Sequence, residues 1–289
     1  MKKSILLRKR LQEKEILVVP GAQAALFAKV IEDAGFEAVY ATGAGIANLQ
    51  LGLPDIGLAT MTETLESVRR IVDATSLPVI ADIDDGFGSS INAYRSAKEF
   101  SRAGVAAVQM EDQAAPKRCG HFAGKSVISK EEMVAKIKAV RDGSLDDDLV
   151  LIARTDAIAT NGFEEAIDRA EAYRQAGADL IFVEAPDNIQ QLKDIPKYVR
   201  CPTVANMVEG GKTPLISTED LQTIGYKMVL FANATLKSAL KGLQTLLEGL
   251  KTCGSTAVLG ELMIEMEVRN ELTGLKDFAK LEELYRIHK

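Results

Sequence analysis

The sequence predicts an α/β fold, a closed (β/α)8 TIM barrel with a C-terminal helical extension, and two observations lead to this prediction. The first is a repeated phrase, in which an amphipathic segment is followed by a glycine and then by a short apolar run. Glycine suits the C-terminal cap of a helix, because it adopts the left-handed conformation without a Cβ penalty. The apolar run suits a buried parallel strand. The phrase occurs at 34–43, 103–112, 176–185 and 224–233.

The second observation is a complete set of strands, because further apolar runs occupy 16–21, 77–84, 149–156 and 201–207. Helical patterns such as TETLESVRRIVDA and SKEEMVAKIKAV lie between the runs. Eight strands that alternate with helices favour a closed barrel. The alternative is an open doubly wound sheet, which usually has fewer strands and a G-x-G-x-x-G turn after the first one. This chain reads PGAQAAL there.

The chain becomes mostly helical after residue 235, with no linker rich in Pro, Gly or Ser. We therefore expect a single domain over residues 1–289, of which 235–289 form the helical extension. This extension packs either on a partner subunit or on its own barrel.

Composition narrows the class of protein. The chain has 289 residues, a net charge of −6 and no long basic run, which argues against a nucleic-acid partner. No stretch approaches the ~20 apolar residues of a membrane helix, so we expect no membrane association. Cys119, Cys201 and Cys253 are scattered without a CxxC pair, which predicts reduced thiols and a cytoplasmic location.

Polar residues follow most of the predicted strands at their C-terminal ends, where barrels carry their active sites. We expect these residues to converge on one pocket. They are Thr42, Gly43, Asp82, Asp84, Asp85, Glu111, Asp112, Arg154, Thr155, Asp156, Glu184, Asn206 and Glu209.

Asp82 and Asp84 are two residues apart, so on a strand both would point to the same face. With Glu111 from the next strand they would form an acidic cluster, which a hard divalent cation would relieve. Oxygen ligands suit Mg²⁺ or Mn²⁺. The alternative is a set of helix caps or solvated carboxylates. We favour that alternative for Asp85 and metal binding for Asp82 with Asp84.

Arg154 ends an apolar strand, and a buried guanidinium needs an anion. It could pair with Asp156 or Glu184, or grip a substrate carboxylate. The residues alone leave these possibilities open.

The stretch KRCGH at 117–121 lies in a loop of about sixteen residues, a length typical of lids and binding loops. Lys117 and Arg118 would lower the pKa of the Cys119 thiol, which could then exchange a proton near neutral pH. Gly120 would let Cys119 and His121 approach one ligand. The alternative is a partly buried cysteine and a surface histidine, but this combination in a long loop favours function.

The helix after this loop is predicted to begin near Ser129, as an N-cap with Glu132 three residues later.

The motifs that carry chemistry resemble those of the isocitrate lyase/phosphoenolpyruvate mutase superfamily, along almost the whole chain. KRCGH is typical of its carbon–carbon lyase branch, because phosphonate mutases lack this cysteine. The matching stretches are VVPGA (18–22), LGLPD (51–55), DIDDGFGSS (82–90), EDQ (111–113), KRCGH (117–121), ARTDA (153–157), VEA (183–185) and NMVEGGKTP (206–214).

The resemblance implies a role for each matching position. Asp82, Asp84 and Glu111 would form a Mg²⁺ site, with Mn²⁺ as a possible substitute, and Asp55 would lie behind it. Cys119 would be the catalytic acid/base on a gating loop, with Lys117 and His121 as further catalytic residues. The implied substrate-binding residues are Tyr40, Thr42, Gly43, Ala44, Gly120, His121, Arg154, Glu184 and Asn206.

The resemblance also implies a reaction, which is Mg²⁺-dependent retro-aldol cleavage of a 2-hydroxy di- or tricarboxylate to pyruvate plus a short carboxylic acid. NMVEGGKTP is similar to the branch that acts on substituted malates, so we favour a substrate such as 2,3-dimethylmalate, which gives pyruvate and propionate. 2-Methylisocitrate, which gives pyruvate and succinate, is the alternative. Oxaloacetate hydrolysis or decarboxylation, a phosphonate mutase and a non-catalytic keto-acid binder remain open. The family implies a homotetramer in which the last helix swaps between subunits.

Overall fold

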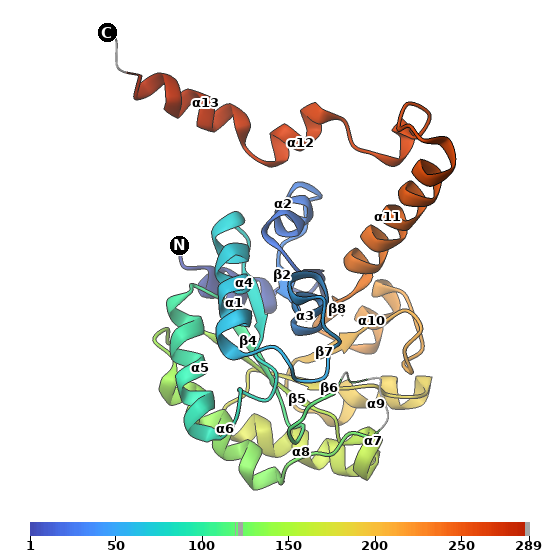
Figure 1. Cartoon of the computed structure of the whole chain (residues 1–289). Coiled ribbons are helices and arrows are strands. Elements are labelled where there is room, and N and C mark those ends of the chain that lie inside the picture. The colour runs from blue at the N-terminus through green and yellow to red at the C-terminus, as the bar shows by residue number, and fades with distance from the viewer. Residues whose placement is uncertain (119, 121–123, 287–289) are drawn as a thin grey trace.

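The structure is a computed structural model that describes residues 1–118, 120 and 124–286 (Figure 1). Its centre is a closed barrel of parallel strands in sequential order, in which β8 pairs with β1. Each predicted apolar run overlaps one strand, which confirms the TIM-barrel fold. The strands are β1 (Leu17–Ala22), β2 (Val39–Ala41), β3 (Val79–Asp82), β4 (Ala107–Glu111), β5 (Val150–Thr155), β6 (Leu180–Val183), β7 (Thr203–Asn206) and β8 (Met228–Phe231).

Helices surround this barrel, and one more closes its N-terminal end. The outer helices are α2 (Ala25–Asp33), α3 (Gly43–Leu51), α4 (Met61–Ala74), α5 (Ser90–Arg102), α6 (Lys130–Gly143), α7 (Ile158–Asn161), α8 (Phe163–Gln175), α9 (Ile189–Tyr198) and α10 (Thr218–Ile224). The predicted cap of α6 is present, since Ser129 Oγ accepts the N–H of Glu132 at 3.1 Å. The helix α1 (Lys3–Gln12) places fully buried Leu7 against the apolar cluster inside the barrel.

The glycines of the repeated phrase end the helices as predicted. Gly35, Gly104, Gly177 and Gly225 have φ values of 82°, 83°, 115° and 111°. In this left-handed region a Cβ is unfavourable, so glycine terminates each helix and turns the chain into the next strand.

The barrel interior is apolar up to a layer that includes Tyr40, Phe182 and Leu230. These side chains also line the floor of the cavity at the C-terminal ends of the strands. A second apolar cluster fills the space between strands and helices, with residues such as Ile71, Phe100 and Ile137. The two clusters together make a rigid base below the polar residues of the barrel mouth.

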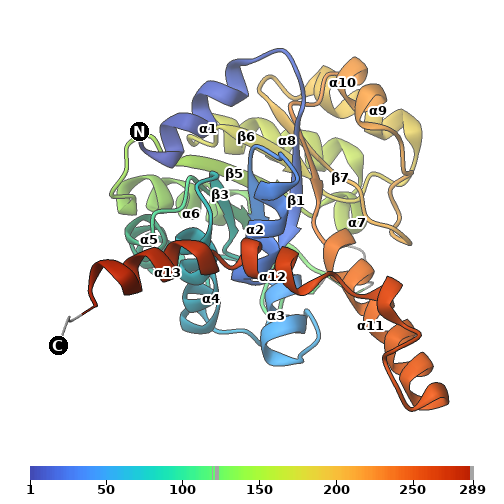
Figure 2. The same cartoon turned by 90° about the horizontal axis from the view of Figure 1, so that it is seen from above.

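The C-terminal helices form an arm that leaves the barrel (Figures 1 and 2). The arm contains α11 (Ala234–Cys253), a 3₁₀ turn η1 (Gly260–Leu262), α12 (Met266–Leu272) and α13 (Leu275–Leu284). Within α11 only Leu236 is buried, and neither α12 nor α13 has a buried residue. The sequence left open whether this extension packs on a partner subunit or on its own barrel. In the structure, the arm packs little on its own barrel.

In the part of the chain that the structure describes, no helix combines the length and the apolar character needed to cross a membrane.

The expectation that the polar residues at strand ends converge on one pocket is met only in part, because Asp85, Asp112, Thr155 and Glu209 do not line the cavity. Asp112 has a structural role instead. Its fully buried carboxylate accepts hydrogen bonds from Thr155 Oγ1 and Tyr173 Oη at 2.7 Å, and from the N–H of Asp156 at 2.9 Å. Arg169 Nη1 adds a contact at 3.2 Å. Asp112 therefore joins β4, β5 and α8 and does not line the cavity.

We predict that Asp112→Asn destabilises the fold by about 2–4 kcal/mol, because an amide NH₂ would face donors and Arg169 would lose a buried anion. Urea unfolding would measure the change. The matched control is Asp168→Asn on α8, whose ion pair with Lys130 is exposed (33% and 60% for Lys130 and Asp168) and should change stability by less than about 1 kcal/mol. Equal effects of the two substitutions would contradict the assignment.

Candidate active site

Asp82 and Asp84 come together through a turn, and the expectation that both lie on a strand is wrong. β3 ends at Asp82, and Asp84 has a left-handed φ of 48°. The turn is fixed because Ile83 N–H donates to Gln109 O and Glu111 N–H donates to Asp84 O, at 2.9 and 2.8 Å. Both carboxylates nevertheless point to one place, because a Cβ on Gly43 would lie 3.0 Å from Asp82 Oδ2 and 3.1 Å from Asp84 Oδ1.

Gly43 begins α3 directly after β2, where Thr42 is the N-cap and its Oγ1 accepts the N–H of Gly45 at 3.3 Å. The Gly43 N–H donates to Asp82 Oδ2 at 3.1 Å. The partial positive charge of a helix N-terminus suits an anion at this position. A Cβ at position 43 would force the carboxylates of Asp82 and Asp84 to shift by a few tenths of an ångström, which favours glycine here.

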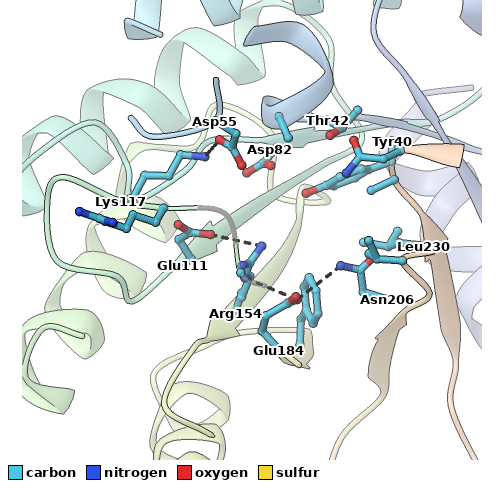
Figure 3. A pocket seen from close by; sticks show the side chains of 17 residues that line it. Tyr40, Thr42, Asp55, Asp82, Glu111, Lys117, Arg154, Glu184, Asn206 and Leu230 are labelled. Carbon is cyan, nitrogen blue, oxygen red and sulfur yellow. Dashed lines mark hydrogen bonds and ion pairs between the residues drawn. The ribbon is translucent and has the colours of Figure 1, made fainter. Parts of the chain in front are cut away.

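Lys117 reaches into the acidic cluster (Figure 3). Its ammonium pairs with Asp55 and lies 2.8 Å from Asp84 Oδ1, and the three side chains are 8%, 13% and 9% exposed. Burial raises the pKa of Asp84 to about 7, although Lys117 opposes the shift. Burial alone would lower the pKa of Lys117, but Asp84, Glu111 and Asp55 outweigh it and raise that pKa. Lys117 thus acts as a counter-ion for these carboxylates.

Arg154 pairs within the chain, which is one of the possibilities that the sequence left open. Its Nε and Nη2 donate to the two oxygens of Asp156 at 2.9 and 3.1 Å, and its Nη1 lies 3.3 Å from Glu111 Oε2. Burial would raise the pKa of Asp156, but Arg154 and Lys125 outweigh it and lower that pKa. The guanidinium also covers the Phe182 ring, 5.1 Å from its centroid. Asp156 therefore fixes the orientation of Arg154.

Glu184 and Asn206 continue the polar lining on the next two strands (Figure 3). Asn206 Nδ2 donates to Glu184 Oε2 at 3.5 Å, and Glu184 Oε2 lies 3.8 Å from Arg154 Nε. Within the described residues, Asn206 Oδ1 and Glu111 Oε1 are buried without a hydrogen-bond partner. Burial raises the pKa of Glu111, against the effect of Arg154. These oxygens are available for a ligand.

Gly120 lies against this charged group. A Cβ at position 120 would overlap Arg154 Nη2 and would lie 2.6 Å from Glu184 Oε1. Lys125 Nζ donates to Gly120 O and to Asp156 Oδ1, the latter at 2.6 Å. The predicted catalytic residues Cys119 and His121 lie outside the described residues.

The cavity enclosed by these residues has a volume of about 40 Å³. Its lining includes the predicted residues Tyr40, Thr42, Ala44, Asp82, Glu111, Lys117, Gly120, Arg154, Glu184 and Asn206. Asp84 and Gly43 lie beside it, at the acidic cluster. Sequence reasoning did not assign roles to Lys125 or to Asn233, another lining residue. Asn233 lies shortly after β8, so its place at a strand end could have predicted that it lines the cavity. Lys125 lies late in a loop, and nothing in the local sequence indicates its role.

The carboxylates at the barrel mouth fit a divalent cation by their chemistry. Those of Asp55, Asp82, Asp84, Glu111, Asp156 and Glu184 outnumber the neighbouring cations Lys117, Arg118, Lys125 and Arg154. Glu111 Oε1 lacks a partner, and oxygen ligands suit Mg²⁺ or Mn²⁺. Across 1–118, 120 and 124–286, no three metal-binding side chains are already grouped around one point. Lys117 stands among the carboxylates and would have to move for a cation to bind.

We predict that Gly120→Ala speeds tryptic cleavage at Lys117, Arg118 and Lys125 by about 10- to 100-fold. The added methyl group overlaps Arg154, such overpacking costs about 1–3 kcal/mol, and each 1.4 kcal/mol changes an opening equilibrium tenfold. Ser126→Ala in the same connection is the control, since Ser126 is exposed. An unchanged cleavage rate in Gly120→Ala would contradict the close packing.

Comparison with known proteins agrees with the geometry. The family model described as phosphoenolpyruvate phosphomutase matches residues 7–251. The chain is 44% identical to 2,3-dimethylmalate lyase of Eubacterium barkeri over 279 residues, covering 96% of both chains. It is 45% identical to 2-methylisocitrate lyase of Shewanella oneidensis over 244 residues, which is 83% of this chain and 84% of that one. These relatives are lyases, as KRCGH predicts.

Solved structures show the same fold along nearly the whole chain. Oxaloacetate acetylhydrolase with the inhibitor 3,3-difluorooxalacetate superimposes with a TM-score of 0.93 at 33% identity, over 98% of this chain and 96% of that one. Phosphonopyruvate hydrolase with oxalate and Mg²⁺ gives 0.90 at 28% identity, over 99% of both chains. The family match and these identities confirm the resemblance seen in the sequence. The chain therefore belongs to the phosphoenolpyruvate mutase/isocitrate lyase superfamily.

Proposed function

We propose that the protein is a Mg²⁺-dependent carbon–carbon lyase that cleaves a substituted malate, such as 2,3-dimethylmalate, to pyruvate and propionate. The observation that carries the proposal is the convergence of Asp82 and Asp84 on Gly43, with Lys117 of the KRCGH motif bound to Asp84. The similarity to 2,3-dimethylmalate lyase over 96% of both chains supports the substrate class.

Asp82, Asp84 and Glu111 would hold the Mg²⁺, directly or through water. When bound, the metal supplies charge that lowers the pKa of a 2-hydroxyl group and stabilises the developing keto acid. Lys117 would have to release Asp84 for a cation to bind there, and it would still have Asp55 as a partner. The same oxygens would thus be neutralised by an ammonium in one state and by the metal in the other.

The chain's own residues would orient the substrate. The backbone of Thr42, Gly43 and Ala44 at the start of α3 would receive the carboxylate next to the hydroxyl, because N–H groups at a helix N-terminus bind anions. Arg154, fixed by Asp156, would bind the second carboxylate together with Gly120, His121, Glu184 and Asn206. Tyr40 would close the floor, where its hydroxyl donates to Gln109.

The reaction breaks the bond between C2 and C3 of the substrate. Loss of the hydroxyl proton turns C2 into the keto carbon of pyruvate, and the electron pair of the broken bond passes to C3. The resulting carbanion is stabilised by its own carboxylate. Cys119, on the KRCGH segment, would donate a proton to C3 and release propionate. Closure of that segment would exclude water, which would otherwise protonate the carbanion.

2-Methylisocitrate, which would give pyruvate and succinate, is the second candidate substrate. The 45% identity to 2-methylisocitrate lyase of Shewanella oneidensis favours it. Both substrates share the 2-hydroxy acid group and the second carboxylate, and they differ in the substituent on C3. A cytoplasmic location with reduced thiols goes with either substrate.

We further propose a homotetramer in which the arm swaps between subunits. Leu275, Phe278, Leu281 and Leu284 form an apolar stripe on α13 and are 46–71% exposed. A helix as short as α13 needs tertiary packing to be stable. An apolar hollow of about 650 Å³ between α2 and α11, lined by Leu26, Val30, Leu243, Leu246 and Ile264, would receive the corresponding part of a second copy.

We predict rapid, Mg²⁺-dependent pyruvate release from one of the two candidate substrates. The release should be lost with EDTA and should fall at least ~100-fold in Cys119→Ser, because a hydroxyl is a much weaker acid than a thiol. A coupled pyruvate assay would measure it. Cys253→Ser is the matched control, since Cys253 lies exposed on the arm. Tight oxalate binding without release from either substrate would refute the lyase function and favour oxaloacetate chemistry or a keto-acid binder.

We predict that Leu281→Asp dissociates the oligomer, because a charge on the apolar stripe opposes its burial. Analytical ultracentrifugation should show smaller species than in the wild type. Lys280→Asp, which changes the charge of an adjacent residue that is 78% exposed, should keep the wild-type assembly. A monomeric wild type would rule out the swap.

A further inference from the structure

Lys125 is the buried charge at the barrel mouth to which the proposed reaction gives no role. Its side chain is 1% exposed, and its Nζ lies 2.6 Å from Asp156 Oδ1, in a side chain that is fully buried. Burial of a lone ammonium costs several kcal/mol, so the position must provide partners that compensate. Asp156 and the carbonyl oxygen of Gly120 are those partners.

The first partner connects Lys125 to Arg154. Asp156 Oδ1 accepts from both Lys125 Nζ and Arg154 Nη2, and Asp156 Oδ2 accepts from Arg154 Nε at 2.9 Å. The two-pronged guanidinium alone would hold this carboxylate from one side only. Bound to cations on two sides, it is fixed, and so is the guanidinium that it holds.

The second partner connects Lys125 to the KRCGH segment. Lys125 donates to Gly120 O, and position 120 is packed so closely on Arg154 and Glu184 that a Cβ would overlap the guanidinium. One ammonium thus bridges the backbone above the cavity and the carboxylate below it. Both connections end at Arg154, which faces the cavity.

We propose that Lys125 is a positioning residue, which orients Arg154 through Asp156 and holds the backbone of Gly120 against that guanidinium. The proposal rests on the lyase function for its kinetic part only, because the packing of residue 120 can be measured without turnover. Lys125 does not line the cavity, so its effect passes through Arg154 and Gly120.

The variant that tests this is Lys125→Met, which keeps the length and apolar contacts of the side chain but removes its charge. Asp156 keeps Arg154 as a partner, so the fold should be retained. We expect kcat/KM for the preferred substrate to fall about 10- to 100-fold, the scale of a displacement of about 1 Å in a substrate-binding group. KM should rise because Arg154 is less fixed. Lys125→Arg should restore most of the loss.

A double-mutant cycle decides whether Lys125 acts through Arg154. If it does, adding Lys125→Met to Arg154→Lys should lower kcat/KM much less than it does in the wild type, because coupled residues are not additive. Additive effects would overturn the proposal. A fall in thermal stability with unchanged kcat and KM would also overturn it, since Lys125 would then be only a structural counter-ion.

Amide hydrogen exchange supplies the readout that is independent of activity. In Lys125→Met, exchange in the connection around Gly120 should accelerate about tenfold or more, as expected when buried contacts that hold a segment are lost. Lys130→Met is the matched control, because its ion pair with Asp168 is exposed. If the wild type shows no lyase activity, exchange still tests Lys125. Exchange like that of the wild type would overturn the role at Gly120.

Discussion

The structure depends on the balance of charge at the C-terminal mouth of the barrel. Carboxylates at or just after the ends of β3, β4, β5 and β6, and one from the loop before α4, meet there and are largely removed from water. Buried charges are tolerated only in pairs, and each lost partner leaves an uncompensated ion. Arg154 supplies one cation from the barrel itself. The others, Lys117 and Lys125, come from the connection between β4 and α6.

The ion pairs of Lys117 and Lys125 attach the connection between β4 and α6 to the mouth of the barrel. Lys117 and Lys125 stand on either side of Cys119 and His121 in the sequence. Lys117 pairs with Asp55 and Asp84, and Lys125 pairs with Asp156. The cavity that these groups line has a volume of about 40 Å³. A bound divalent cation would compete with the lysines for these carboxylates, and a substrate carboxylate would compete for the cationic side chains. Binding and coverage are therefore linked through the same ions.

The barrel below provides the rigidity that this charge balance needs. Its apolar interior ends at Tyr40, Phe182 and Leu230, and the polar groups begin directly above. Arg154 stacks on Phe182, so the last apolar layer also fixes the first polar one. Asp112, turned away from the mouth, joins β4 and β5 to α8 and keeps neighbouring strand ends in register.

The sequence by itself determined the barrel, because glycine caps and apolar runs are local signals that recur along the chain. It also determined the family and which residues end the strands, since KRCGH and the acidic motifs can be read directly. Tertiary structure decided what those residues do. Asp84 joins Asp82 through a left-handed turn and not through strand alternation, and Asp112 leaves the cluster. Lys125 has a role only because the fold brings residues 120, 125 and 156 together. The local sequence around a residue does not show which distant residue it will pair with.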